Sequence, residues 1–221
     1  MRKFMIAIVL CLAGSAQAKE LVIAALGDSL TQGYGLPQEE GFVPQLQDWL
    51  TAEGAEVTLI NAGVSGDTTA GGLSRVDWTL TPDVDGMIVA LGGNDLLRGL
   101  DPDQARINLE GILKAAAAKQ VDVLLIGMEA PQNFGAEYKS RFDALYSDLA
   151  EDYGAVFMPD FFAGIRQGHE ATDMASLRAF FQPDGIHPNA EGVALVVTEV
   201  GPQVLTLVEK LQDGASSVSG N

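Results

Sequence analysis

Cysteine and histidine are nearly absent from the chain. Cys11 is the only cysteine among 221 residues, and His169 and His187 are the only histidines. Cys11 falls in an N-terminal segment that we expect to be removed, which leaves the mature protein without a thiol or a disulfide. Two histidines without a cysteine provide no ligand set for zinc. We therefore expect no metal ion and no organic cofactor.

Basic residues are also scarce. Thirteen Lys and Arg stand against thirty Asp and Glu, which gives a formal net charge of −17 at pH 7. A surface this negative repels nucleic-acid backbones and anionic lipid, so neither class of partner is expected. The hydrophobic fraction of 47% is high enough to form a large core, which excludes disorder as the main state.

Long hydrophobic runs are absent apart from a short one at the N-terminus. Phe4–Leu12 is an apolar run that follows the basic pair Arg2 and Lys3 and precedes the small-residue site Ala16-Gln17-Ala18. This three-part pattern is typical of a secretory signal peptide over residues 1–18, cleaved after Ala18. The alternative is an N-terminal membrane anchor, for which the run is too short.

Two further observations bear on the compartment. Ile8, Val9 and Leu10 precede Cys11 and are not the small residues that a lipoprotein cleavage site needs, so we expect no lipid anchor. No later stretch approaches ~20 consecutive apolar residues, the length of a membrane-spanning helix. The mature protein is expected to be periplasmic or secreted, without stable insertion into a membrane.

Short apolar runs rich in β-branched residues alternate with segments of helical periodicity. Strands that are apolar on both faces and alternate with helices favour an α/β fold with a parallel sheet covered on both sides. One domain over residues 19–213 accounts for the pattern. The strand-like runs are Leu21–Leu26, Val57–Ile60, Val84–Leu91, Val121–Ile126 and the weaker Ala155–Met158.

Three segments between these runs place apolar side chains three and four positions apart, as on the buried face of a helix. A last helix is predicted to begin after Asn189. The tail 214–221, rich in Ser and Gly, is expected to fray. The predicted buried faces are Phe42, Leu46, Trp49 and Leu50; Leu109, Ile112, Leu113 and Ala116; and Phe142, Leu145, Tyr146 and Leu149.

Polar and glycine-rich clusters follow the first three strand-like runs. They are Gly27-Asp28-Ser29-Leu30, Asn61-Ala62-Gly63-Val64-Ser65-Gly66-Asp67 and Gly92-Gly93-Asn94-Asp95. The carboxyl ends of parallel strands share one edge of a sheet, where ligands bind. Any one cluster is explained equally well as a strand-to-helix turn. The three together predict a crevice lined by chemistry-bearing residues.

His187 has the better setting of the two histidines. It lies in the turn-rich octapeptide Gln182–Asn189, and Asp184 precedes it by three residues. A carboxylate so placed can accept from one ring nitrogen and leave the other free as a base. The alternative is an ordinary surface turn. His169 has no such partner nearby, and we interpret it as a solvated loop residue.

A serine at a strand-to-helix turn, together with an Asp–His pair, supplies the parts of a serine hydrolase. The Gly-x-Ser-x-Gly elbow of α/β-hydrolases is absent, which counts against that superfamily. Neither a Gly-x₄-Gly-Lys-Ser/Thr loop nor a Gly-x-Gly-x-x-Gly fingerprint occurs, so nucleotide binding has no motif.

The chain resembles the GDSL (SGNH) hydrolases, within them the secreted arylesterase and thioesterase I/lysophospholipase-like group. Four blocks match in the family's order, and the resemblance spans nearly the whole mature chain. It implies a flavodoxin-like, three-layer α/β/α sandwich with about five parallel strands. The blocks are Leu26-Gly27-Asp28-Ser29-Leu30-Thr31, Asn61–Thr68, Leu91-Gly92-Gly93-Asn94-Asp95 and Asp184-Gly185-Ile186-His187-Pro188.

The resemblance also implies roles. Ser29 is expected to be the nucleophile, His187 the general base and Asp184 its orienting partner. The backbone N–H groups of Ser29 and Gly66 and the side-chain amide of Asn94 are expected to form the oxyanion hole.

The segment Gly127–Gly135 resembles the loop that borders the acyl site in relatives, so Ala130, Pro131 and Phe134 are candidate substrate-binding residues. For Phe134 the alternative is a core residue that packs inward.

These roles predict a serine esterase that acts on small ester substrates, namely aryl or alkyl esters, thioesters or lysophospholipids. The nearest alternative is a carbohydrate O-deacetylase with the same site and a narrower, more polar acyl pocket. A binding protein with an inactive site is the alternative of another class, but no catalytic position is missing. No pattern in the sequence specifies an oligomeric state.

Overall fold

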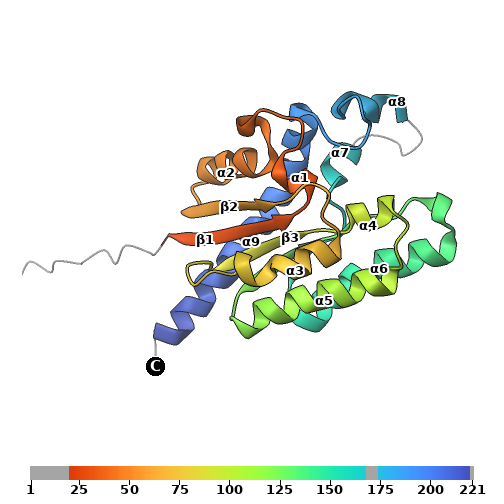
Figure 1. Ribbon diagram of the computed structural model, residues 1–221. Helices are drawn as coiled ribbons and strands as arrows, with labels where there is room; N and C mark the ends of the chain where they lie inside the picture. Colours follow the sequence, from red (N-terminus) through yellow and green to blue (C-terminus); the bar gives the residue numbers. More distant parts are fainter. Residues whose placement is uncertain (1–19, 168–173, 220–221) are drawn as a thin grey trace, which may run out of the picture.

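The computed structural model describes residues 20–167 and 174–219. The predicted leader, residues 1–18, and the predicted loop residue His169 lie outside the described residues. Figure 1 shows a central sheet with helices on both of its faces. This architecture confirms the expected three-layer α/β/α sandwich.

Five parallel strands form the sheet, in the order β2-β1-β3-β4-β5. This is the flavodoxin-like strand order, in which the chain reverses direction across the sheet between β1 and β3. All five predicted strands are present, although the third begins at Gly86 and not at Val84. They are β1 (Leu21–Gly27), β2 (Val57–Gly63), β3 (Gly86–Ala90), β4 (Asp122–Ile126) and β5 (Val156–Met158).

The central strands are buried on both faces, whereas the edge strand β2 is partly exposed. Helices α3 (Thr69–Thr79), α5 (Pro102–Ala118) and α6 (Ala136–Tyr153) pack beside one another on one face of the sheet. Helices α2 (Phe42–Ala52) and α9 (Ala190–Ser219) cover the other (Figure 1). The predicted apolar faces of α2, α5 and α6 are buried, except that Trp49 is only partly buried.

Helix α9 starts at the predicted position but ends later than predicted. It continues through Gly214 to Ser219, so residues 214–219 extend the helix where an irregular tail was expected. A glycine weakens a helix by about 1 kcal/mol without ending it, and no proline follows Gly214. Within the described ranges, α9 is the one helix long and apolar enough to cross a membrane, and half of that stretch is buried against the rest of the domain.

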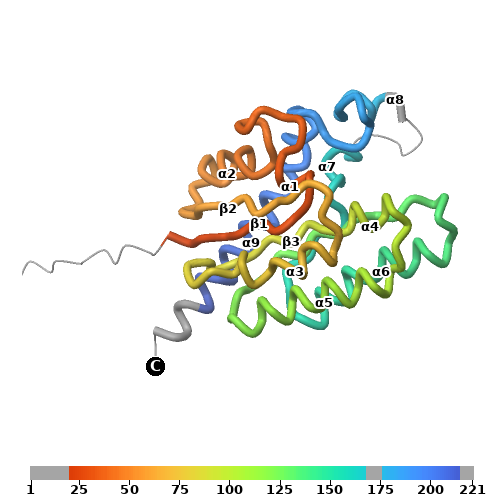
Figure 2. The backbone as a smooth tube through the Cα atoms, viewed as in Figure 1, coloured from red at the N-terminus to blue at the C-terminus, as the bar shows by residue number. Residues whose placement is uncertain are grey.

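Short helical segments gather beyond the carboxyl ends of the strands, as the backbone trace in Figure 2 shows. They are α1 (Ser29–Gln32), α4 (Gly93–Leu97), α7 (Ala163–Arg166) and α8 (Met174–Leu177), with the 3₁₀ turns η1 (Gln38–Glu40), η2 (Gln132–Phe134) and η3 (Arg178–Phe180).

Candidate active site

Ser29 is the first residue of α1 and is separated from the end of strand β1 by Asp28 alone. Asp28 caps this helix, because its side chain accepts a hydrogen bond from the backbone N–H of Leu30 at 3.0 Å. The helix ends after one turn at Gly33, whose φ of +87° is a left-handed conformation that favours glycine. The serine side chain therefore stands at the rim of the sheet.

His187 lies in the loop between η3 and α9, and it contacts both predicted partners. Its Nδ1 lies 2.7 Å from Oδ2 of Asp184. Its Nε2 lies 2.8 Å from Oγ of Ser29, a residue 158 positions earlier in the chain. With the ring neutral, Nδ1–H donates to the carboxylate and Nε2 accepts from the serine hydroxyl. The structure thus brings together the serine, histidine and aspartate singled out from the sequence.

The hydrogen bonds around Asp184 keep its carboxylate ionised. Its other oxygen, Oδ1, accepts from the backbone N–H groups of Ile186 at 2.9 Å and His187 at 3.0 Å. The hydrogen bond from His187, followed by these two backbone bonds, lowers the pKa of Asp184 to about 2. A carboxylate that stays charged at all working pH values can fix the imidazole tautomer and stabilise the imidazolium.

Gln182 fastens the histidine loop to the serine loop. Its side-chain amide donates to the backbone oxygens of Tyr34 at 2.8 Å and of Pro188 at 2.9 Å. The Tyr34 ring also lies against the His187 ring, with 4.7 Å between their centroids. Neither residue was singled out from the sequence, since only the fold brings Tyr34 to the histidine.

Asn94 lies at the start of α4, after the glycine pair that follows β3. Its Nδ2 donates to Oδ2 of Asp28 at 3.2 Å. Gly92 has a φ of +117°, and a Cβ there would lie 2.0 Å from Oη of Tyr146. The Tyr146 hydroxyl donates to the carbonyl of Leu91 at 3.0 Å, so this turn is held against α6.

Gly66 occupies the turn after β2, with a φ of +85°. Its carbonyl accepts from Nη2 of Arg98, the residue that ends α4, at 2.9 Å. Ser29 and Asn94 line a common pocket, described below, and Gly66 is not among its lining residues. The place of Gly66 in the oxyanion hole therefore stays a prediction, and the contact that the structure gives it is with Arg98.

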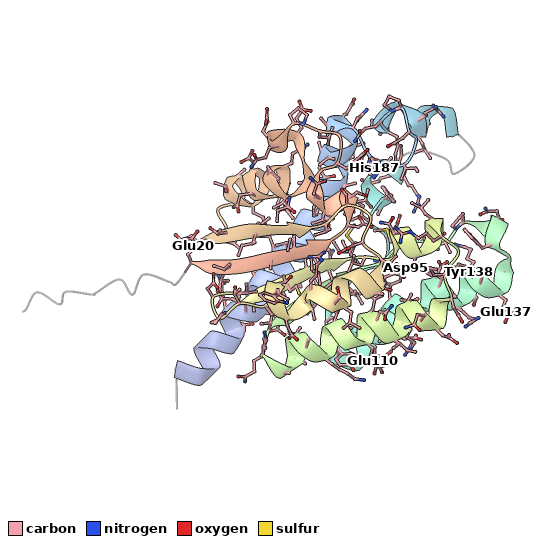
Figure 3. The ribbon with its side chains drawn as sticks, in the orientation of Figure 1. Glu20, Asp95, Glu110, Glu137, Tyr138 and His187 are labelled. Carbon is pink, nitrogen blue, oxygen red and sulfur yellow. The ribbon has the colours of Figure 1, made fainter. Side chains whose placement is uncertain are left out.

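Two side chains, the buried Asp95 and the partly buried Arg75, join the loops that present these residues. The carboxylate of Asp95, 1% exposed, accepts from the backbone N–H of Thr69 at 2.8 Å and from its hydroxyl at 2.7 Å. It thereby joins the start of α3 to α4. Arg75 of α3 donates to the carbonyls of Gly27 and Ala62, at the ends of β1 and β2. Figure 3 shows Asp95 and His187 beyond the same edge of the sheet.

A pocket of about 370 Å³ opens beside Ser29 and Asn94. Most of its wall is apolar, although the lining also includes Glu129 and Arg166, which form an ion pair of 3.1 Å. A wall of this composition suits an acyl chain or an aromatic ring. Its apolar lining residues are Leu30, Leu96, Leu97, Met128, Pro131, Phe134, Phe162 and Ile186.

Two of the three predicted substrate-binding residues line this pocket, and one does not. Pro131 and Phe134 lie in the wall, and Phe134 is 37% exposed and stacks on Tyr138 at a centroid distance of 4.9 Å. Ala130 is only 1% exposed and is not part of the wall. Its N–H donates to Asp143 at 2.8 Å, which turns this residue into the core.

Among the described residues, no three His, Cys, Asp or Glu side chains lie close enough to hold a metal ion.

The pocket lining that the sequence did not suggest includes Leu97, Phe162 and Ile186. Leu97 lies two residues after a matched block and Ile186 lies inside one, which was the one signal available for them. Phe162 comes from the segment after β5, which has no distinctive motif.

A serine at the end of the first strand, hydrogen-bonded to an Asp–His pair beside an apolar pocket, defines a serine hydrolase of the flavodoxin-like fold class. The chain belongs to the GDSL-like lipase/acylhydrolase family, which it matches over residues 25–195. It is a serine ester hydrolase.

Three relatives are similar over most of their length. The chain is 34% identical to Esterase TesA of Pseudomonas aeruginosa, covering 87% of this chain and 92% of that protein. It is 32% identical to an Arylesterase of Vibrio mimicus, covering 88% and 93%. It is also 32% identical to Thioesterase 1/protease 1/lysophospholipase L1 of Escherichia coli, covering 88% and 87%. The crystal structure of AlinE4, an SGNH-hydrolase family esterase, is 43% identical with a TM-score of 0.68, covering 86% and 98%.

Proposed function

We propose that the protein hydrolyses carboxylic esters through an acyl-enzyme on Ser29, with His187 as the base and Asp184 as its orienting partner. The observation that carries this proposal is the continuous contact from Asp184 through His187 to Oγ of Ser29, at 2.7 and 2.8 Å, beside an open apolar pocket. The His187–Ser29 contact is short enough for a proton to transfer along it, and the Asp184–His187 contact is short enough for the carboxylate to hold the ring in place.

The chemistry follows from this arrangement. Nε2 of His187 takes the hydroxyl proton while Oγ of Ser29 attacks the ester carbonyl, which places a negative charge on the carbonyl oxygen. The tetrahedral intermediate collapses as the imidazolium protonates the leaving alcohol. Water then attacks the acyl-serine by the same route in reverse, with the neutral imidazole again as the base.

The oxyanion requires fixed donors. We assign them to the backbone N–H groups of Ser29 and Gly66 and to Nδ2 of Asn94. The Asn94 amide is a neutral donor at any ordinary pH. The positive φ of Gly66 and the Arg98 hydrogen bond to its carbonyl support a backbone conformation held for this purpose.

The apolar pocket supports substrates with short to medium acyl chains, as aryl or alkyl esters, thioesters or lysophospholipids. The names of the relatives, which include an arylesterase and a thioesterase/lysophospholipase, agree with this range. Turnover of aryl esters graded from acetyl to about decanoyl, with an acetylated polysaccharide alongside, tests the assignment. Activity on the polysaccharide alone would replace it with a carbohydrate O-deacetylase.

Phe134→Ala is expected to weaken long acyl chains more than short ones. Phe134 lines the pocket, and each buried methylene that loses contact costs about 0.8 kcal/mol. Loss of about two such contacts lowers kcat/KM for an octanoyl aryl ester roughly 10-fold, with less than about a 2-fold change for acetyl. The measurement is kcat/KM for both esters, with a melting curve.

Ile107→Ala is the matched control, because Ile107 is an exposed apolar residue on α5, 57% exposed. It is expected to change neither ester. An equal loss on both esters after Phe134→Ala would remove the case for acyl binding at this wall.

Export is the second part of the proposal. The pattern of residues 1–18 supports removal of a leader after Ala18 and a periplasmic or secreted mature protein that acts on small esters. Intact mass or N-terminal sequencing of exported material is expected to show a chain that begins at Lys19. A retained leader, or lipid mass on Cys11, would contradict this.

A further inference from the structure

Asp28, the residue before the candidate nucleophile, is a buried carboxylate whose two oxygens have separate partners. The side chain is 1% exposed. Oδ1 accepts from the backbone N–H of Leu30 at 3.0 Å, and Oδ2 accepts from Nδ2 of Asn94 at 3.2 Å. A Cβ on Gly93 would lie 3.3 Å from Oδ2, so a glycine there lets the start of α4 approach the carboxylate.

We propose that Asp28 is a positioning residue: it fixes the Asn94 side chain with its nitrogen, and not its oxygen, toward the oxyanion, an inference that rests on the proposed function.

The physical reason is that a carboxylate can only accept hydrogen bonds. An asparagine amide is nearly symmetrical in shape, and a half-turn about its last torsion exchanges oxygen and nitrogen. Opposite Asp28 the reversed amide would place oxygen against oxygen. The side chain is therefore held with one N–H on Asp28, which leaves the second N–H of the same nitrogen for the ester oxygen.

No other side chain of this size satisfies both partners. An asparagine at position 28 has one accepting oxygen, so it can serve Leu30 or Asn94 but not both, and its own NH₂ can donate to a reversed Asn94. A serine can still cap α1, since serine is a good N-cap, but its single oxygen leaves Asn94 without a second acceptor. Only a carboxylate both caps the helix and orients the amide.

The charge state of Asp28 supports the same role. Burial raises its pKa to about 6, against the lowering effects of Leu30 N–H, the Asn94 amide and the His187 charge, while Asp67 raises it. Above this pH the carboxylate orients Asn94. Below it, a protonated Asp28 can donate to the Asn94 oxygen, and the amide is free to reverse.

The raised pKa also predicts that Asp28 has opposite effects on activity and on the stability of the fold. The pKa of about 6 lies above the ordinary value of 3.8, so the folded state binds this proton more tightly than the unfolded state. The stability due to this group is complete below about pH 4 and is lost as pH rises through about 6. Asp28→Asn is therefore expected to gain melting temperature relative to wild type between pH 4 and pH 8, while it loses activity.

The test is a double-mutant cycle on an aryl ester at pH 8. Asp28→Asn and Asp28→Ser are each expected to lower kcat about 10- to 100-fold and to leave KM within about 2-fold of wild type. Asn94→Ala removes the donor itself, so its expected loss in kcat is larger, roughly 10²–10³-fold. Because Asp28 acts through Asn94, adding Asp28→Asn to Asn94→Ala is expected to cost less than about 3-fold more.

Asp101→Asn is the matched control, because Asp101 also caps a helix, accepting from the N–H of Asp103 at 3.1 Å at the start of α5. It is expected to retain wild-type kcat. Wild-type kcat in either Asp28 variant, or a double-variant loss equal to the product of the single losses, would overturn the proposal. Asp28→Ser keeps the test decisive if Asp28→Asn does not fold. A wild-type protein without ester turnover or labelling by a fluorophosphonate would contradict the proposed function instead.

Discussion

Ser29→Ala is expected to abolish ester turnover and labelling by a fluorophosphonate probe, with the fold intact. The hydroxyl is the group that Nε2 of His187 contacts, and without it no acyl-enzyme can form. Removing a nucleophile that acts as part of a unit lowers kcat on the order of 10⁴–10⁶-fold. Turnover of an aryl ester and intact mass after labelling, with a melting curve, provide the measurement.

Ser74→Ala is the matched control. Ser74 is an exposed serine on α3 whose hydroxyl donates to the carbonyl of Gly71 at 2.7 Å. The Ser74→Ala variant is expected to be labelled at Ser29 and to turn over ester at the wild-type rate. Retention of more than about a tenth of wild-type activity in Ser29→Ala, against the loss of at least 10⁴-fold expected here, would sink the assignment of Ser29 as the nucleophile.

The sheet could be predicted because its strands are buried on both faces. The central strands consist almost wholly of apolar residues, and such runs are visible in a sequence without knowledge of their neighbours. Their ends are less visible. Val84 is buried and apolar like the residues of β3, but it precedes the first paired residue, Gly86.

The site could be predicted as far as its residues follow strands along the chain. Ser29 and Asn94 each come three residues after the end of a predicted strand, and parallel strands end at one edge. The supports of the site could not be predicted in this way. The bond of Asp95 to Thr69 joins residues 26 positions apart, and that of Arg75 to the Gly27 carbonyl joins residues 48 apart. Such pairs depend on how helices dock.

The error at Ala130 has a local cause. A loop has no period that distinguishes its inner from its outer side, so neighbouring positions such as Ala130 and Pro131 look equally able to face a ligand. The hydrogen bond from the Ala130 N–H to Asp143 of α6 decides the matter. This hydrogen bond turns Ala130 toward the core, while Pro131 lines the pocket.

His187→Ala is expected to lower kcat by a factor on the order of 10⁴–10⁶, as large as the loss for Ser29, because nucleophile and base act as one unit. The wild-type rate is expected to rise with pH as His187 loses its proton, since only the neutral imidazole can accept the Ser29 proton. In His187→Ala the residual rate is expected to lack this rise. The measurement is kcat/KM from about pH 4 to pH 9.

The protonation of two carboxylates, Asp184 and Asp28, must be distinguished from the pH dependence assigned to His187. Asp184, with a pKa of about 2, is ionised throughout the range and contributes no limb. Asp28, with a pKa of about 6, titrates within it. The Asp28→Asn variant removes that contribution, so a rise with pH that survives in Asp28→Asn and disappears in His187→Ala belongs to the histidine.

His169→Ala is the control that the chain itself offers, since it has only these two histidines. Its profile is expected to match the wild type in height and in pH dependence. The comparison is decisive because either histidine could produce a rise with pH, and the proposal assigns it to His187, whose Nε2 lies 2.8 Å from Oγ of Ser29. If His169→Ala removed the activity and His187→Ala did not, the proton would leave Ser29 by another route and the assigned triad would be wrong.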